Sequence, residues 1–387
     1  MTSIATTEDT VTTEDTLGTA TLTEGEHGVL RRAAVGPFDF EFGGHLPQVE
    51  LAYETWGSLN AQRSNAVLVM HALTGDAHVS QGDSQTAGWW EDFVGPGLTV
   101  DTDKYFVVSI NMVGGCNGST GPATLDETGR PWGSRFPFVT IKDSVRLEQR
   151  LAQRLGVERW HAVIGGSMGG ARALEYAVHF PQQVANLVVM ASTGQSSAEQ
   201  IALAQVQTQA IRMDPHFAGG DYYANQVRPD QGLGIARRLA HISYRSESEL
   251  ETRFGRKAQA GEVPDGKFDD QRGRYQVESY LDHQASKLVN RFDANSYVVL
   301  TEALMSHDVA RGHESFEAAL ARLAPVNVVV AAVTSDRLYF PEQSVRLANA
   351  LVRSKPVHYI QSPIGHDGFL TDAKQLDPVL RTLVFED

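Results

Sequence analysis

The stretch HAVIGGSMGGARALEY, residues 161–176, places four glycines around a single serine. A β-rich apolar run precedes the serine and a helical run follows it. Residues 165–169, GGSMG, fit the G-x-S-x-G pattern in the strand–turn–helix context that a nucleophile elbow requires. Glycine at positions 165 and 169 removes Cβ atoms that would collide in so sharp a turn. The stretch therefore predicts an α/β sheet that exposes the hydroxyl of Ser167; the alternative is a tight strand–helix turn with an ordinary serine.

Composition and charge exclude several classes of protein. The chain has 387 residues, which favours one core with an insertion or two domains. With 33 Lys and Arg against 47 Asp and Glu, the net charge of −14 argues against nonspecific nucleic-acid binding. The single cysteine, Cys116, excludes an internal disulfide and fits a reducing cytoplasm. No apolar run is long enough to span a bilayer and no signal peptide is recognisable, so we expect no membrane association.

The order of strand-like and helix-like runs predicts an interrupted α/β sheet. Residues 1–27 are polar and rich in Thr and Glu, which predicts a disordered tail. The core begins at residues 28–194, a helical insertion without strand signals occupies 195–315, and the core resumes at 316–387. Nearly continuous apolar runs predict strands covered on both faces at 49–56, 65–73, 105–113, 161–166, 186–192, 326–335 and 357–363.

A serine hydroxyl needs a base, and that base needs an acid to orient it. Asp336 ends one predicted strand, and His366 lies in a glycine-flanked loop after the next strand. This order, Ser then Asp then His at strand ends, is the order that the elbow motif requires. We therefore predict Ser167, Asp336 and His366 as a catalytic triad, although a loop Asp or His taken alone is usually just solvated.

Two backbone amides are expected to stabilise an oxyanion. The residue after the nucleophile supplies one and a loop after an early strand supplies the other, which selects Met168 and Leu73. His71 at the end of that strand is interpreted as a structural residue. The glycine-rich run 114–122 lacks the lysine of a phosphate-binding loop, and no base accompanies Cys116. No spacing typical of a metal site occurs.

Several segments together resemble one enzyme family. GGSMGG, GCNGSTGP, SDRLYFP and GHDGFL, in this order, resemble the homoserine O-acetyltransferases of the α/β-hydrolase superfamily. LAYETWGSLN and NRFDANSYVVLTEAL resemble them too, so the match covers nearly the whole chain after the polar tail. The resemblance implies an α/β-hydrolase fold with a mostly parallel central sheet, a helical lid insertion over a deep tunnel, and the triad named above.

The resemblance also implies the reaction. An acetyl group would pass from acetyl-CoA, through acyl-Ser167, to the hydroxyl of L-homoserine, as an early step of methionine biosynthesis. It implies no permanently bound cofactor and a homodimer to which the lid contributes. It places Arg237 on the substrate carboxylate, with the neighbouring Arg238 left open, and Asp367 on the substrate ammonium. Taken without the resemblance, two arginines on a helix are more often a solvated face, and Asp367 would be a simple loop cap.

Other functions remain open from the sequence alone. The same triad with water as the acceptor would make a serine esterase or thioesterase. The family also includes succinyl-transferring members, so a homoserine O-succinyltransferase is another alternative. A binding protein without activity is the third, since a fold alone does not prove catalysis.

Overall fold

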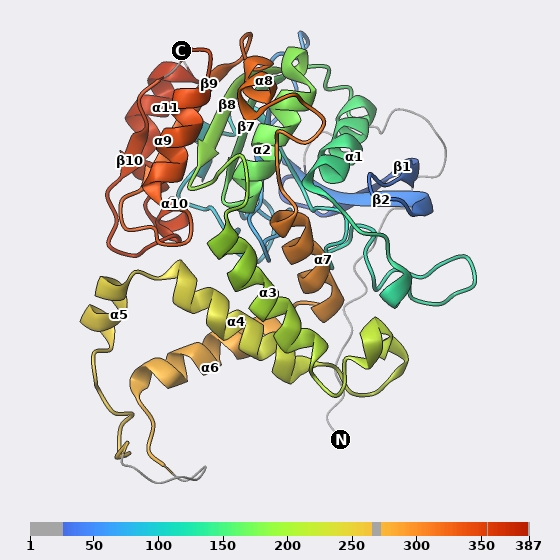
Figure 1. Ribbon diagram of the computed structural model, residues 1–387. Coiled ribbons are helices and arrows are strands. Elements are labelled where there is room, and N and C mark those ends of the chain that lie inside the picture. The colour runs from blue at the N-terminus through green and yellow to red at the C-terminus, as the bar shows by residue number, and fades with distance from the viewer. Residues whose placement is uncertain (1–25, 265–271, 354, 386–387) are drawn as a thin grey trace.

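The computed structural model describes residues 26–264, 272–353 and 355–385. The polar tail predicted over residues 1–27 lies outside the described residues, except for its last two. The centre of the structure is an eight-stranded sheet with the order β1-β2-β6-β3-β7-β8-β9-β10 (Figure 1). Its strands are β1 (Arg31–Asp39), β2 (His45–Trp56), β3 (Ala66–Met70), β6 (Phe106–Ile110), β7 (Trp160–Gly166), β8 (Val184–Met190), β9 (Asn327–Val333) and β10 (His358–Ile360).

The sheet is parallel except at one edge. β2 pairs antiparallel with both β1 and β6, whereas every neighbouring pair from β6 to β10 is parallel. The sequence analysis did not identify β1. Its RRAAVGPFD sequence holds two arginines, a glycine and a proline, and it lies at the sheet edge, so it lacks the apolar run of a strand covered on both faces. β4 (Val94–Gly95) and β5 (Val100–Asp101) form a separate two-stranded ladder.

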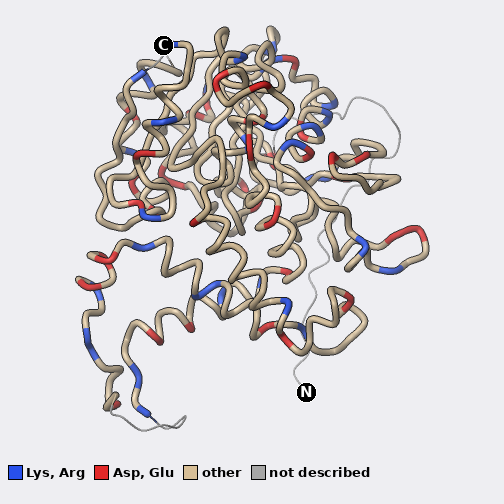
Figure 2. Tube along the Cα trace, viewed as in Figure 1, with Lys and Arg blue, Asp and Glu red and all other residues tan. Residues whose placement is uncertain are grey.

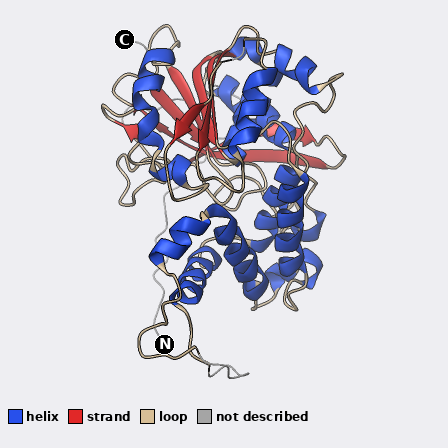
Figure 3. Cartoon of the chain, turned by 60° about the vertical axis from the view of Figure 1, so that its left-hand side comes forward, coloured by secondary structure: helices blue, strands red, loops and turns tan. Residues whose placement is uncertain are grey.

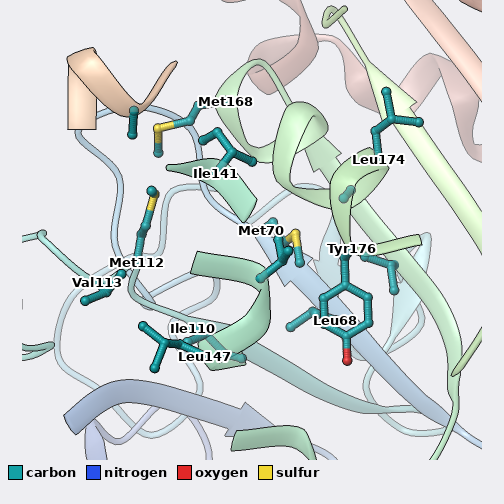
Figure 4. Close-up of a cluster of buried hydrophobic side chains, with 14 of the residues drawn as sticks. Leu68, Met70, Ile110, Met112, Val113, Ile141, Leu147, Met168, Leu174 and Tyr176 are labelled. Carbon is teal, nitrogen blue, oxygen red and sulfur yellow. The ribbon is translucent and has the colours of Figure 1, made fainter. Parts of the chain in front are cut away.

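Alternate residues of each central strand belong to two different cores. In β3, Leu68 and Met70 face one buried cluster, whereas Val67 and Val69 face the other. This alternation follows from the two-residue period of a strand, and both faces are apolar because helices cover both (Figure 3). Figure 4 shows part of the first cluster, in which β3 packs against residues of α1 and α2.

The helices divide between the two faces of the sheet and the segment that links β8 to β9. They are α1 (Ile141–Arg154), α2 (Met168–His179), α3 (Ala198–Arg212), α4 (Asp230–Tyr244), α5 (Glu247–Arg253), α6 (Gln276–Val289), α7 (Ala294–Met305), α8 (Phe316–Ala321), α9 (Pro341–Ala350), α10 (Gly368–Thr371) and α11 (Asp377–Leu383). Among the described residues, none of these helices is long and apolar enough to cross a bilayer.

Helices α3–α7 form a lid at one end of the sheet (Figures 1 and 3). Helix α4 packs on both α3 and α6, and α3 also packs on α7. The segment has no strand between β8 and β9 among the described residues, so the α/β-hydrolase arrangement with a mostly parallel sheet and a helical insertion is confirmed. The boundaries at 194/195 and 315/316 stay predictions. Residues of both charge signs occur along the core and the lid (Figure 2).

Candidate active site

Ser167 lies at the sharp turn between β7 and α2. Its backbone has φ 56° and ψ −127°, a conformation that is strained for a residue with a side chain. A Cβ at position 165 would lie 2.1 Å from the carbonyl oxygen of Gly169, and one at position 169 would lie 2.0 Å from the carbonyl oxygen of Met70. Both distances are far too short for two non-bonded atoms, so neither position can carry a Cβ. The glycines are therefore a steric requirement of the turn that presents the serine.

The three residues of the predicted triad lie in one hydrogen-bonded chain. His366 Nε2 is 2.8 Å from Ser167 Oγ, and His366 Nδ1 is 2.7 Å from Asp336 Oδ2. Because an ionised carboxylate only accepts, Nδ1 carries the proton and Nε2 is free to accept from the serine. The Asp336 Oδ1 atom accepts the backbone N–H groups of Leu338 and Tyr339, both at 2.8 Å, which fixes the carboxylate. All three side chains are buried.

The pKa of His366 is set by opposing effects. Burial alone lowers it, but the charge of Asp336, its hydrogen bond and the charge of Asp367 together outweigh burial, so the pKa of His366 is raised above its ordinary value of 6.5. A more basic imidazole is a stronger proton acceptor for the serine hydroxyl. It also needs a higher pH to be neutral.

The loop after β3 approaches the serine from the other side. His71 is fully buried; its Nε2 accepts the N–H of Met112, and burial, with the nearby charge of Arg172, lowers its pKa to about 3. His71 is therefore neutral and braces the loop. Thr74 has φ 66°, which turns the chain just after Leu73. Met168 is the first residue of α2, so its N–H has no acceptor within the helix.

A polar cavity opens beside Ser167 and His366. It has a volume of about 190 Å³, and its charged lining residues are Arg237, Arg291 and Asp367. The guanidinium of Arg237 donates to the hydroxyl of Thr74 at 3.3 Å, and its Nε has no hydrogen-bond partner among the described residues. A guanidinium that lines a cavity is a candidate partner for an anionic ligand.

Arg238 lies elsewhere. It pairs with Asp282 of α6, with nitrogen–oxygen distances of 2.8 and 3.0 Å, and it does not line the polar cavity. Adjacent helical residues point about 100° apart, so only one of the two arginines can face the cavity. The geometry places Arg237, and not Arg238, beside the triad.

The structure adds two arginines that the sequence analysis missed. Arg245 lies 3.3 Å from Asp367, and the pKa of Asp367 is raised by burial although Arg245 opposes the rise. Arg291 donates to the backbone oxygen of Thr74 at 2.9 Å and lines the polar cavity. Both come from the lid, and no local pattern near either residue indicates that it folds back onto the site.

Other candidate chemistry is not supported by the described residues. Burial raises the pKa of Cys116 to about 11, so its thiol is not a ready nucleophile. No group of three or more His, Cys, Asp or Glu side chains in the described part of the chain could hold a metal ion. The arrangement that remains can form and break an ester on Ser167, because it holds a nucleophile, a base and an orienting acid in contact.

Fold and site together have the form of the α/β-hydrolase class, and residues 65–373 match the family model described as alpha/beta hydrolase fold. A homoserine O-acetyltransferase of Thermobifida fusca is 53% identical over 90% of this chain and 91% of its own length. The chain therefore belongs to the homoserine O-acetyltransferase family.

Solved structures with different activities share this architecture. The homoserine O-acetyltransferase from Bacillus anthracis has a TM-score of 0.85 at 27% identity, over 93% of this chain and 98% of its own. An acetylester hydrolase from Corynebacterium glutamicum has a TM-score of 0.77 at 26% identity, over 93% and 97%. The same scaffold thus serves transferases and hydrolases.

The raised pKa of His366 predicts the pH dependence of Ser167 reactivity. A fluorophosphonate probe should label Ser167 at a rate that falls about tenfold per pH unit below the pKa of His366, because only the neutral imidazole accepts the serine proton. The midpoint, measured by intact-protein mass spectrometry over time, should lie above pH 6.5. The Ser167→Ala variant is the control and should not be labelled. A midpoint below pH 6.5 would contradict the electrostatic interpretation.

Proposed function

We propose that this protein transfers an acetyl group from acetyl-CoA to the hydroxyl of L-homoserine through an acetyl-Ser167 intermediate. The observation that carries the proposal is the hydrogen-bonded chain Ser167–His366–Asp336, which faces a cavity lined by two guanidinium groups and the carboxylate of Asp367. Membership of the homoserine O-acetyltransferase family gives the acyl group and the acceptor.

In the first half-reaction Ser167 attacks the thioester carbonyl. The Ser167 proton passes to His366 Nε2, an oxygen–carbon bond forms, and the carbon–sulfur bond then breaks as the same proton moves to the departing thiol. The amides of Leu73 and Met168 are the proposed donors to the tetrahedral oxyanion. Asp336 stabilises the imidazolium while it exists. No permanently bound cofactor is needed for these steps.

In the second half-reaction the acceptor occupies the polar cavity. Arg237 would bind the carboxylate of L-homoserine and Asp367 its ammonium, which aims the hydroxyl toward His366. Asp367 already faces Arg245 at 3.3 Å, so the ammonium would share this carboxylate with a guanidinium that holds it in place. His366 then takes the hydroxyl proton as the homoserine oxygen bonds to the acetyl carbon. The bond between that carbon and the Ser167 oxygen breaks, and His366 returns the proton to Ser167.

Hydrolysis is the competing function, and the acetylester hydrolase with a similar fold gives it a specific basis. Both reactions begin with the same acyl-enzyme and differ only in the acceptor. The zwitterion clamp favours the transferase, because water needs neither Arg237 nor Asp367. We place the enzyme in the cytoplasm, where it would supply O-acetyl-L-homoserine for methionine biosynthesis.

The lifetime of the acyl-enzyme, with and without homoserine, distinguishes a transferase from a hydrolase. With acetyl-CoA alone, acetyl-Ser167 should accumulate, because deacylation waits for the amino-acid acceptor. L-Homoserine should discharge it rapidly, and D-homoserine poorly, since a two-point clamp fixes the direction of the hydroxyl. Intact-protein mass spectrometry over time, with and without acceptor, measures both steps. Rapid loss of the acetyl group to water, unaffected by homoserine, would make the protein a hydrolase.

The two neighbouring arginines give a matched pair of variants. Arg237→Lys should weaken the use of homoserine by about 2–5 kcal/mol in kcat/KM, because lysine cannot make the planar two-point contact with a carboxylate. Acylation by acetyl-CoA alone should change far less. Arg238→Lys, whose side chain pairs with Asp282 on the lid, is the control and should leave both steps near wild type. An impairment confined to Arg238→Lys would reverse the assignment.

A homodimer through the lid is part of the proposal. Helix α3 exposes Ala202, Val206 and, at its C-terminal end, Met213, while α4 exposes Ile235 and Ile242. Each set repeats at helical spacing, so each helix presents an apolar stripe to solvent.

If these stripes meet a second copy, a charge within them should split the dimer. Val206→Asp and Ile235→Asp should each shift the mass measured by light scattering from dimer to monomer. Val352→Asp is the control, because Val352 is 62% exposed on the core and lies outside the lid. A wild-type monomer, or dimers in all variants, would contradict the proposed interface.

A further inference from the structure

A second cavity meets the first at Ser167. This apolar chamber, whose apolar lining residues include Leu203, Ala204, Leu304, Met305 and Leu338, has a volume of about 50 Å³. It shares three residues with the polar cavity: Leu73, Ser167 and Tyr244. None of its 14 lining residues carries a charge, whereas the polar cavity has Arg237, Arg291 and Asp367. The two spaces beside Ser167 therefore differ in charge: one lining is charged and the other is neutral.

The polar groups of the apolar chamber are mostly engaged elsewhere. The side chain of Gln200 donates to the backbone oxygen of Leu338 at 2.8 Å, and that of Gln207 accepts the hydroxyl of Tyr297 at 2.5 Å. The hydroxyl of Thr301 is buried and has no partner among the described residues. The polar groups that the lining offers to a ligand, such as this hydroxyl and the amide nitrogen of Gln207, are thus all neutral.

The stereochemistry of acyl transfer assigns a role to each space. A tetrahedral carbon on Ser167 has four substituents: the serine oxygen, the oxyanion, the leaving or entering group, and the rest of the acyl group. The leaving or entering group must lie near His366, which exchanges its proton, and His366 lines the polar cavity. The oxyanion faces the loop at Leu73. His366 does not line the apolar chamber, although Tyr339, stacked on its ring at 5.1 Å, does.

We infer that the apolar chamber is the acyl pocket and that it selects short, uncharged acyl groups. The carbon chain of the acyl group enters between α3 and α7, where Ala204 and Met305 limit its length. Propionyl and butyryl groups meet the same apolar walls as acetyl. A succinyl group would bring a carboxylate into a space whose lining holds no cation, and neutral polar groups compensate less for its lost hydration than a cation would.

The inference deepens the proposed function and rests on it, because it needs an acyl-Ser167 intermediate. The transfer itself is unchanged: the Ser167 oxygen–carbon bond forms, the carbon–sulfur bond breaks, and His366 carries the proton from the hydroxyl to the thiol of CoA. Only the group attached to the carbonyl carbon differs among donors.

The experiment compares donors by the rate at which they acylate Ser167 in a single turnover. Acetyl-, propionyl-, butyryl- and succinyl-CoA are mixed separately with the full-length enzyme, without homoserine, and the intact mass is followed over time. Acetyl and propionyl should react within about tenfold of each other, and succinyl at least about 100-fold more slowly than acetyl. The ratio of rates between donors is the readout, so a partial loss of active enzyme cancels.

Two variants change the chamber in opposite directions. Ala204→Leu fills it and should lower the butyryl-to-acetyl ratio at least about tenfold, whereas Met305→Ala enlarges it and should raise that ratio. Ala198 is an exposed residue of the same helix, α3, so Ala198→Leu is the matched control. This variant should leave the butyryl-to-acetyl ratio unchanged.

The outcomes separate the inference from the proposed function. Succinyl-CoA acylating Ser167 as fast as acetyl-CoA, or unchanged donor ratios in both chamber variants, would overturn the acyl-pocket assignment and leave the acyl-enzyme mechanism standing. Failure of every donor to acylate Ser167 would remove the proposed function and the inference together.

Discussion

The rest of the site depends on the steric condition at the turn between β7 and α2. Ser167 is held at φ 56° because the backbones of β7, α2 and β3 approach within distances that no Cβ at 165 or 169 could tolerate. This close approach brings the start of α2 beside the end of β3. The Met168 amide and the loop at Leu73 therefore both lie near the serine. Strain at one residue is maintained by packing of three elements around it.

A buried ion pair also holds α2 and the end of β3 in position. Arg172 of α2 lies 2.6 Å from Glu148 of α1, and both side chains are essentially inaccessible to solvent. The same guanidinium donates to the backbone oxygens of His71 and Ile110, at the ends of β3 and β6, so one side chain ties two helices and two strands. Since a buried pair adds little net stability relative to apolar packing, its contribution is better understood as positional: it sets where the strand ends lie.

In the proposed mechanism the core supplies the reacting groups, and the lid contributes arginines and apolar side chains to the two cavities beside Ser167. Arg237 of α4 and Arg291 at the α6–α7 junction both contact Thr74, so the lid is anchored on the loop that follows β3. The same lid separates the surroundings of Ser167 into a charged space and an uncharged one. In the proposed mechanism, the charged acceptor and the acyl group therefore occupy different spaces beside Ser167. The transferase and the acetylester hydrolase that resemble this chain share its fold, so we propose that lid residues contribute to the choice of substrate.

The sequence alone determined the features that depend on local pattern: the elbow at residues 165–169, the covered strands, and the order of Ser167, Asp336 and His366 along the chain. These were predictable because glycine placement and apolar runs reflect short-range sterics and burial. The sequence could not reveal β1, because a strand at the sheet edge needs no apolar run. It also left open the choice between Arg237 and Arg238, because two adjacent arginines do not indicate which side of the helix will face a cavity. The partnership of Arg245 with Asp367 and the apolar chamber between α3 and α7 were decided only by tertiary structure. Each joins residues about 100 or more positions apart, and only the packing of the lid on the core brings such residues together.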